Sequence, residues 1–305
     1  MKISCAWLYA ITKYGYPPSL KDIRKAMNDM ASLGFRYIEL EGGVVYENLY
    51  EVYDHRKELL EHAESLGLKI INFCPVLPDI VSMEPARKEK AFKALEKAAE
   101  LTVFFGADTL QLDSFTPPLE FVGEHPYKEA ISFGLQLRVK VNLEFNWEKF
   151  WQNMVNTFRK ACDIAENHGL KLILEPRVGE NISNTDAMLR LIDAVNKDNF
   201  GAVLDTGHLH AQKEILPLSV EKLGKKILYV HVSDNDGRDN YHLGLGKGTI
   251  DWEGVFLALK KHGFNRYVAI DIGGTGFKGD LDKEVVESKK FLENLLKKLG
   301  IPVEG

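Results

Sequence analysis

Four apolar segments of this sequence each end in a side chain that can ionise or bind a metal. These segments are Leu172-Ile173-Leu174-Glu175, Ala202-Val203-Leu204-Asp205, Leu228-Tyr229-Val230-His231 and Val268-Ala269-Ile270-Asp271. An ionised group that finishes an apolar run is costly unless it is paired or bound to a metal. Three carboxylates and one imidazole suit Mn²⁺, Mg²⁺ or Co²⁺, and the histidine also admits Zn²⁺. Each residue alone could cap its strand, but four along one chain favour a shared divalent metal site.

Two further polar residues follow these segment ends closely. His208 comes three residues after Asp205, at turn spacing, which favours a place near the metal or the substrate over a structural hydrogen bond. Arg177 comes two residues after Glu175 and suits either a clamp on a hydroxyl, carboxylate or phosphate group or a plain salt bridge. The run Gly244-x-Gly246-x-Gly248 is similar to a phosphate cradle but leads directly into no predicted helix, whereas Gly273-Gly274-Thr275-Gly276 is better placed for phosphate.

Short β-rich apolar runs alternate with longer segments of helical period along the whole chain. The predicted strands are Lys2–Ala6, Arg36–Glu41, Lys69–Cys74, Asp108–Leu112, Lys171–Glu175, Gly201–Asp205, Ile227–Val232 and Tyr267–Ile272. The predicted helices include Leu20–Leu33, Arg87–Phe105, Trp147–His168, Asp186–Val195 and a closing helix at Lys283–Leu299. Eight such units predict a (β/α)₈ TIM barrel, which needs about 250 residues. A doubly wound open sheet is the alternative, but the segment after Ala6 lacks the glycine-rich turn of that fold.

Two long segments interrupt this rhythm, at Asp113–Asn146 after the fourth strand and at Ser233–Asp251 after the seventh. Both follow strand carboxyl ends, where barrels build their active sites, so we expect lids or walls there. No linker rich in Pro, Gly or Ser divides the chain, which predicts a single domain over residues 1–305.

Composition excludes several classes of protein. The chain has 305 residues, of which 45% are hydrophobic and 27% charged, as in a globular protein. Its net charge of −5 argues against a nucleic-acid partner, which needs a clustered positive field. Its three cysteines form no CxxC pair, which suits a reducing cytoplasm. The sequence contains no run of 18 apolar residues, so it predicts no membrane span. The apolar segment Ile3–Ile11 lacks a convincing signal-peptide cleavage site.

The sequence resembles the xylose-isomerase-like barrel superfamily of sugar isomerases and epimerases, which shares its fold with the family 2 abasic-site endonucleases. The resemblance lies in Leu174-Glu175-Pro176, Leu204-Asp205-Thr206-Gly207-His208, Val230-His231-Val232-Ser233-Asp234 and the segment from His242 to Asp251. It implies a metal held by Glu175, Asp205, His231 and Asp271. The chain departs from ketose-epimerising members at Asp271, where they have Glu. It also lacks the extra histidine ligands that the DNA-repair branch has after its third and fourth strands.

The resemblance implies chemistry on a small sugar or cyclitol ketone through a metal-stabilised enediolate. Glu175 would act as general base, and Asp271 on the opposite wall would return the proton to give an epimer. Transfer by Glu175 alone would give an aldose–ketose isomer, and loss of a β-hydroxyl would give dehydration of an inosose-type ketone. A sugar-binding barrel without catalysis is the alternative from another class, favoured by the Asp271 departure.

Further residues are expected at the mouth of the barrel, where they would contact the substrate. His242 and Lys247 lie in the family segment after the seventh strand. Trp7 follows the first strand and would either stack on a sugar face or pack under the barrel. Glu39 and Glu41 end the second strand at the same mouth. Barrels of this kind often associate, so the sequence leaves both a monomer and a homo-oligomer as alternatives.

Overall fold

Eight parallel strands close into a barrel within the part of the chain that the structure describes. The structure is a computed structural model, and it describes residues 1–43, 45–116, 119–122, 139–274 and 277–304. Each strand pairs with its sequence neighbour, and β1 pairs with β8 to close the ring. The strands are β1 (Lys2–Cys5), β2 (Tyr37–Gly43), β3 (Lys69–Val76), β4 (Thr109–Leu112), β5 (Lys171–Leu174), β6 (Phe200–Asp205), β7 (Ile227–Val232) and β8 (Tyr267–Ile270). The predicted TIM barrel is confirmed.

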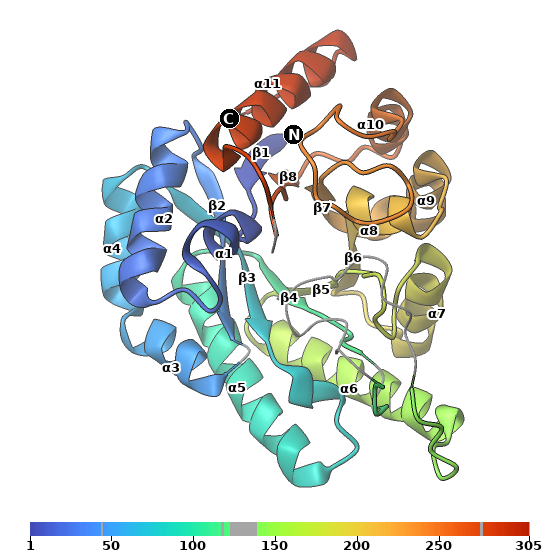
Figure 1. Ribbon diagram of the computed structural model, residues 1–305. Coiled ribbons are helices and arrows are strands. Elements are labelled where there is room, and N and C mark those ends of the chain that lie inside the picture. Colours follow the sequence, from blue (N-terminus) through green and yellow to red (C-terminus); the bar gives the residue numbers. More distant parts are fainter. Residues whose placement is uncertain (44, 117–118, 123–138, 275–276, 305) are drawn as a thin grey trace.

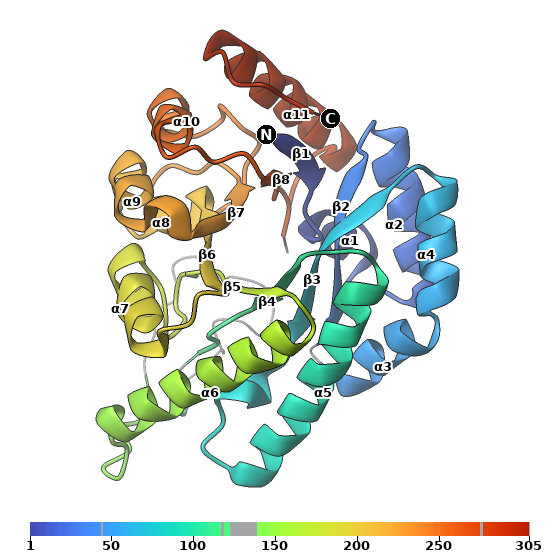
Figure 2. The ribbon, with the colours of Figure 1, turned by 180° about the vertical axis from the view of Figure 1, so that it is seen from behind.

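Helices surround the strands on all sides, as Figures 1 and 2 show from opposite directions. They are α1 (Leu8–Tyr14), α2 (Leu20–Ser32), α3 (Tyr46–Asp54), α4 (Arg56–Ser65), α5 (Pro85–Phe104), α6 (Trp147–Asn167), α7 (Thr185–Val195), α8 (Thr206–Ala211), α9 (Leu216–Leu223), α10 (Trp252–Lys261) and α11 (Leu281–Lys298). Two short 3₁₀ turns, η1 (Pro78–Val81) and η2 (Gly224–Lys226), complete the described elements. No helix in the described ranges is long and apolar enough to cross a membrane.

The inside of the barrel is built in layers because strand side chains alternate between its two faces. One buried cluster, which we call the floor cluster, comprises Ala6, Tyr37, Ile71, Ile173, Val203, Tyr229 and Ala269. Five of its members stand two residues before a polar residue of the same strand or of its end, namely before Glu39, Glu175, Asp205, His231 and Asp271. The five polar side chains therefore project to the inside, directly above an apolar floor.

Irregularities in the pairing register of two strand pairs determine where some of these polar side chains point. The pairing of β6 with β7 passes from Ala202↔Ile227 to Val203↔Tyr229, so Leu228 is skipped. This shift brings Asp205 opposite His231. A similar shift between β2 and β3 occurs immediately before Glu39. An extra residue of this kind changes where the following side chains point, and such bulges are common next to active sites.

Of the two long loops predicted from the sequence, the structure describes the one after β7 in full and the one after β4 in part. Residues 233–251 connect β7 to α10 without a helix and include a bridge between Asp234 and Leu243. Within 113–146, residues 117–118 and 123–138 lie outside the described residues, as do Thr275 and Gly276 of the second glycine-rich run. The extent of a single domain over residues 1–305 stays a prediction.

Candidate functional site

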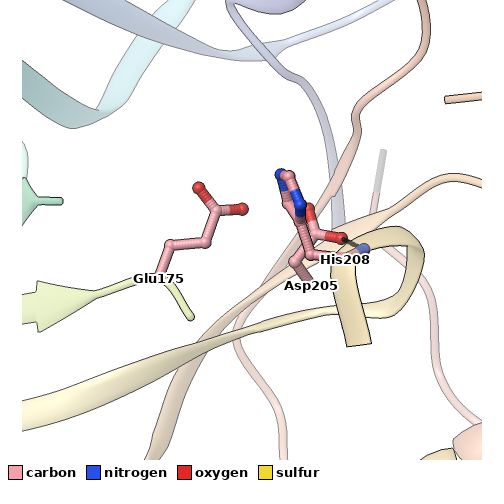
Figure 3. A group of neighbouring side chains, drawn as sticks. All are labelled: Glu175, Asp205 and His208. Atoms are coloured by element: carbon pink, nitrogen blue, oxygen red, sulfur yellow. Dashed lines mark hydrogen bonds between the residues drawn. The ribbon is translucent and has the colours of Figure 1, made fainter. Parts of the chain in front are cut away.

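The barrel brings together all four residues of the predicted metal site. Glu175 follows β5, Asp205 ends β6, His231 lies in β7 and Asp271 follows β8, and all four are buried. Ligand atoms of Asp205, His231 and Asp271 lie within 4.8 Å of one another, and so do those of Glu175, Asp205 and His208 (Figure 3). Four strand ends and the start of α8 thus converge on one point.

Asp205 has one satisfied and one unsatisfied carboxylate oxygen. Its Oδ1 accepts the His208 backbone N–H at 2.7 Å and caps the start of α8. Its Oδ2 is buried without a hydrogen-bond partner and faces His231 Nδ1 at 3.7 Å. Burial, with the carboxylates of Glu175 and Asp271 nearby, raises the pKa of Asp205 well above its usual range. A buried carboxylate oxygen that accepts no hydrogen bond is suited to coordinate a cation.

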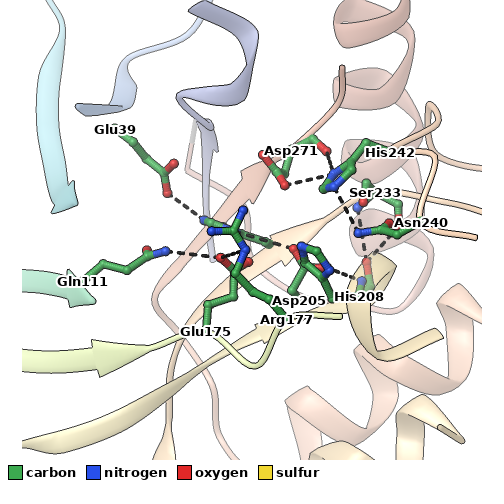
Figure 4. Close-up of polar contacts among 12 residues, drawn as sticks. Glu39, Gln111, Glu175, Arg177, Asp205, His208, Ser233, Asn240, His242 and Asp271 are labelled. Atoms are coloured by element: carbon green, nitrogen blue, oxygen red, sulfur yellow. Dashed lines mark hydrogen bonds and ion pairs between the residues drawn. The ribbon is translucent and has the colours of Figure 1, made fainter. Parts of the chain in front are cut away.

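His231 lies between two carboxylates. Its Nδ1 is 2.8 Å from Glu175 Oε1, and its Nε2 is 2.9 Å from Glu39 Oε1. Figure 4 labels both glutamates, of which Glu39 lies in strand β2 and Glu175 directly follows strand β5. Although burial opposes the charged ring, Glu39 and Glu175 raise the pKa of His231 well above its usual range. Metal-binding histidines commonly donate their second ring N–H to a carboxylate, and Glu39 stands in the position to accept it. The sequence placed Glu39 at the mouth but did not indicate this pairing.

A chain of amide side chains holds the second oxygen of Glu175. Gln111 donates from Nε2 to Glu175 Oε2 at 3.3 Å, and Asn72 donates to Gln111 Oε1 at 2.8 Å. Thr109 then donates to Asn72 Oδ1 at 3.0 Å. Burial works against ionisation of Glu175, but His231 and Arg177 lower its pKa well below the usual range. Sequence reasoning missed Gln111 and Asn72, although polar residues inside apolar strands were the available signal.

His242 contacts Asp271 from the loop after β7. Its Nδ1 is 3.1 Å from Asp271 Oδ2 and 3.0 Å from the Asp271 carbonyl oxygen. The Nε2 of the same ring is 3.0 Å from Asn240 Nδ2, and the ring lies edge-on to His208 at a centroid distance of 5.4 Å. The Val178 backbone N–H donates to His208 Nδ1 at 3.2 Å. Burial, reinforced by Arg177, lowers the pKa of His208 well below its usual range, so this ring is neutral.

Arg177 forms ion pairs at the edge of the group. Its Nη1 donates to Asp113 Oδ2 at 2.9 Å, and its Nε lies 3.7 Å from Glu175 Oε2. Glu180 Oε1 is 3.9 Å from Nη1, while Glu180 Oε2 accepts two backbone N–H groups at the start of the loop after β4. Arg177 thereby ties the loops after β4 and β5 together and sets a positive charge beside Glu175.

Two further residues expected at the substrate are Lys247 and Trp7. Lys247 forms ion pairs with Glu284 and Glu287 of α11, and its side chain is 45% exposed. Trp7 is 1% exposed and packs in the apolar core, where its backbone N–H donates to Glu39 Oε2 at 3.1 Å. The acidic face of α11 attracts Lys247 away from the mouth, and burial of the indole corresponds to the packing interpretation of Trp7.

The donor set fits a hard or borderline divalent cation. It offers three carboxylates and an imidazole, and one of the carboxylate oxygens has no hydrogen-bond partner. The carboxylate of Glu39 lies behind the imidazole. Within the described residues, the carboxylates of this buried group outnumber the basic side chains in contact with them, which are His231, His242 and Arg177. A bound cation would remove this imbalance.

The comparisons with known proteins agree with this fold. A model of the xylose isomerase-like TIM barrel family matches residues 27–295. The structure of a D-tagatose 3-epimerase-like protein superposes with a TM-score of 0.73 at 20% identity over 98% of both chains. The zinc-bound structure of IOLI protein gives 0.72 at 20% identity, over 98% of this chain and 99% of the other.

Curated relatives match shorter stretches. Inosose isomerase of Bacillus subtilis is 30% identical over 134 residues, which are 41% of this chain and 48% of the relative. The chain therefore spans about half the length of that relative. L-ribulose 3-epimerase of Methylomonas is 26% identical over 249 residues, 78% of this chain and 74% of the relative. Since the family match extends over most of the sequence, this chain belongs to the xylose isomerase-like TIM barrel family.

Proposed function

We propose that this protein is a divalent-metal-dependent enzyme that isomerises or epimerises a small sugar or polyol ketone. The observation that carries the proposal is that Asp205 Oδ2 has no hydrogen-bond partner although it is buried beside the imidazole of His231 and the carboxylate of Glu175. The membership of this chain in the xylose isomerase-like TIM barrel family supports the reaction class. So do the relatives named as an inosose isomerase and an L-ribulose 3-epimerase.

Glu175, Asp205, His231 and Asp271 would hold the ion, with Glu39 orienting the imidazole. Mn²⁺, Mg²⁺ and Co²⁺ suit the carboxylates, and Zn²⁺ suits the histidine; a fold neighbour was solved with zinc. When bound, a divalent ion acts as a Lewis acid that polarises a substrate carbonyl.

Glu175 is the proposed general base. Arg177 and His231 keep its carboxylate ionised, and Gln111 fixes the orientation of Oε2. From this position Glu175 would remove the proton from the carbon beside the carbonyl, which leaves an enediolate. Return of the proton by Glu175 to the neighbouring carbon gives an isomer.

Asp271 is the proposed second acid for epimerisation, because β8 lies across the barrel from the end of β5. His242 Nδ1 orients its carboxylate. His208, Arg177 and His242 are the proposed contacts for substrate hydroxyls, whereas the positions of Lys247 and Trp7 give no support for such a role.

Proton exchange tests the proposal directly. Metal-reconstituted protein in D₂O, given free and phosphorylated ketoses and inososes, should place deuterium beside the carbonyl by NMR. Glu175→Gln should reduce this exchange by about 10²–10⁴-fold or more, while circular dichroism shows an intact fold. Glu89→Gln, which changes an exposed acid on α5 that pairs with Lys93, is the matched control and should retain full exchange.

The products separate the alternatives. Deuterated isomer or epimer supports the proposal, and the labelled carbon distinguishes the two. Loss of water with a conjugated product would assign the protein to the dehydratases instead. Full exchange in Glu175→Gln would refute the role of Glu175, and no exchange in metal-loaded wild type would favour a sugar-binding barrel.

A further inference from the structure

Asp234 is a fully buried carboxylate outside the proposed metal group. It follows β7 by two residues and is 0% exposed. In the described part of the chain it has no ion pair with a lysine or arginine. Four N–H groups donate to it: Gly246 N at 2.9 Å and Trp252 Nε1 at 3.0 Å to Oδ2, and Asn235 N at 3.0 Å and Ile250 N at 3.3 Å to Oδ1.

This arrangement has the chemistry of an anion-binding loop with the anion supplied by the protein. Backbone N–H groups that converge from a glycine-rich segment commonly bind phosphate. The run from Gly244 to Gly248 has that appearance in sequence, yet its Gly246 N–H already binds Asp234. A Cβ added at Gly248 would lie 2.3 Å from Asp234 Oδ1 and 2.1 Å from the Asn235 carbonyl oxygen. Glycine is therefore required there by the Asn235 backbone and by the Asp234 carboxylate together.

The same residue fixes the segment that carries His242. The Asp234 N–H donates to the Leu243 carbonyl at 2.9 Å, and the Leu243 N–H donates to the Asp234 carbonyl at 2.9 Å. His242 is the residue immediately before Leu243, and it contacts both the carboxylate and the carbonyl of Asp271. Backbone and side chain of Asp234 thus hold the two ends of the loop segment from His242 to Ile250.

We propose that Asp234 is the internal anion of the glycine-rich run and a positioning residue for His242. The Gly246 N–H of the run is then not available to a substrate phosphate, because it already donates to Asp234. The effect on turnover rests on the proposed function above, whereas the occupancy of the run by Asp234 does not.

Chemical rescue tests the occupancy. Asp234→Gly removes the carboxylate and leaves four buried N–H groups without an acceptor, so we expect the melting temperature to fall by roughly 8–24 °C. Sodium formate should refill the space and raise the melting temperature of Asp234→Gly saturably, while sodium chloride at equal ionic strength should not. Asp236→Gly, which removes an exposed acid two residues away, is the matched control and should show no formate effect.

Asp234→Asn keeps the result interpretable if Asp234→Gly does not fold. The amide keeps one acceptor but turns an NH₂ group toward donors, so this variant should melt below wild type and formate should not restore it. A melting temperature equal to wild type, or an Asp234→Gly variant that formate leaves unchanged, would overturn the proposal. Inorganic phosphate that stabilises wild type but not Asp234→Asn would also overturn it.

Turnover tests the positioning role separately. In folded Asp234→Gly we expect kcat to fall roughly ten- to hundredfold with Mn²⁺ affinity unchanged, and formate to restore kcat together with the melting temperature. Restored stability without restored kcat would refute the positioning of His242 and leave the internal anion intact. If wild type catalyses no exchange at all, the proposed function fails while the melting experiment still decides the occupancy.

Discussion

Replacing Asp205 by asparagine separates the effects of its two oxygen atoms. Asparagine keeps Oδ1, which accepts the His208 N–H, and it caps helices as well as aspartate does. The substitution removes the charge of Oδ2. This oxygen is buried beside the carboxylates of Glu175 and Asp271 and has no hydrogen-bond partner. We therefore expect the metal-free Asp205→Asn protein to be more stable than metal-free wild type.

The size of this gain follows from the cost of an unpartnered buried group, about 1–3 kcal/mol. For a chain of this length, 1 kcal/mol corresponds to about 2 °C, so the melting temperature should rise by roughly 2–6 °C. Bound metal should instead stabilise wild type relative to the variant. Mn²⁺ at 100 times its dissociation constant should stabilise wild type by about 2.7 kcal/mol, and Asp205→Asn should lose this response.

Calorimetry of protein treated with EDTA, with and without MnCl₂, measures both quantities. Asp251→Asn is the matched control, because Asp251 caps α10 through the Gly254 N–H at 3.0 Å and is exposed. It should change neither value. The reasoning fails if metal-free Asp205→Asn melts below wild type, or if Mn²⁺ stabilises it as much as wild type.

Two further predictions concern residues outside the metal ligands. Glu39→Gln weakens the acceptor behind the His231 ring, so titration calorimetry should show a Mn²⁺ affinity reduced about 10–100-fold; an unchanged affinity would mean that Glu39 does not act through His231. Asp282 is held by Lys13 at 2.8 Å and by the Tyr9 hydroxyl at 2.6 Å, which lower its pKa although burial opposes this. Its stabilising effect is present above the unfolded pKa of about 4 and is lost as the pH falls through the lowered value. Urea unfolding should therefore show a smaller acid loss of stability in Asp282→Asn, and equal acid losses in the two proteins would contradict the assignment.

Strand positions were predictable because each strand is a short apolar run and these runs alternate with longer segments of helical period. The bounds of β7 match the prediction, and the other strands differ by one or two residues at their ends. The short helices α1 and α8 were not predicted, because seven and six residues are too few to show a helical period. Residue type and place at a strand end were enough to find Glu175, Asp205, His231 and Asp271.

Contacts across the barrel were not predictable in the same way. The pairing of Glu39 with His231 depends on register shifts in β2–β3 and β6–β7, which leave no mark in composition. Lys247 lies in a loop whose course is fixed by Asp234, and loop geometry directs its side chain to Glu284. Sequence therefore indicates which groups reach the mouth from strands far better than which loop groups face it.

The floor cluster has a consequence for the kinetics of the proposed enzyme. Its side chains are at most 4% exposed and fill the barrel beneath the polar layer. Neither water nor a sugar can cross the barrel along its axis, so substrate must arrive and product must leave over the same strand ends. One shared entrance means that each product molecule has to depart before the next substrate enters. In a reversible interconversion, accumulated product then competes directly with substrate for free enzyme.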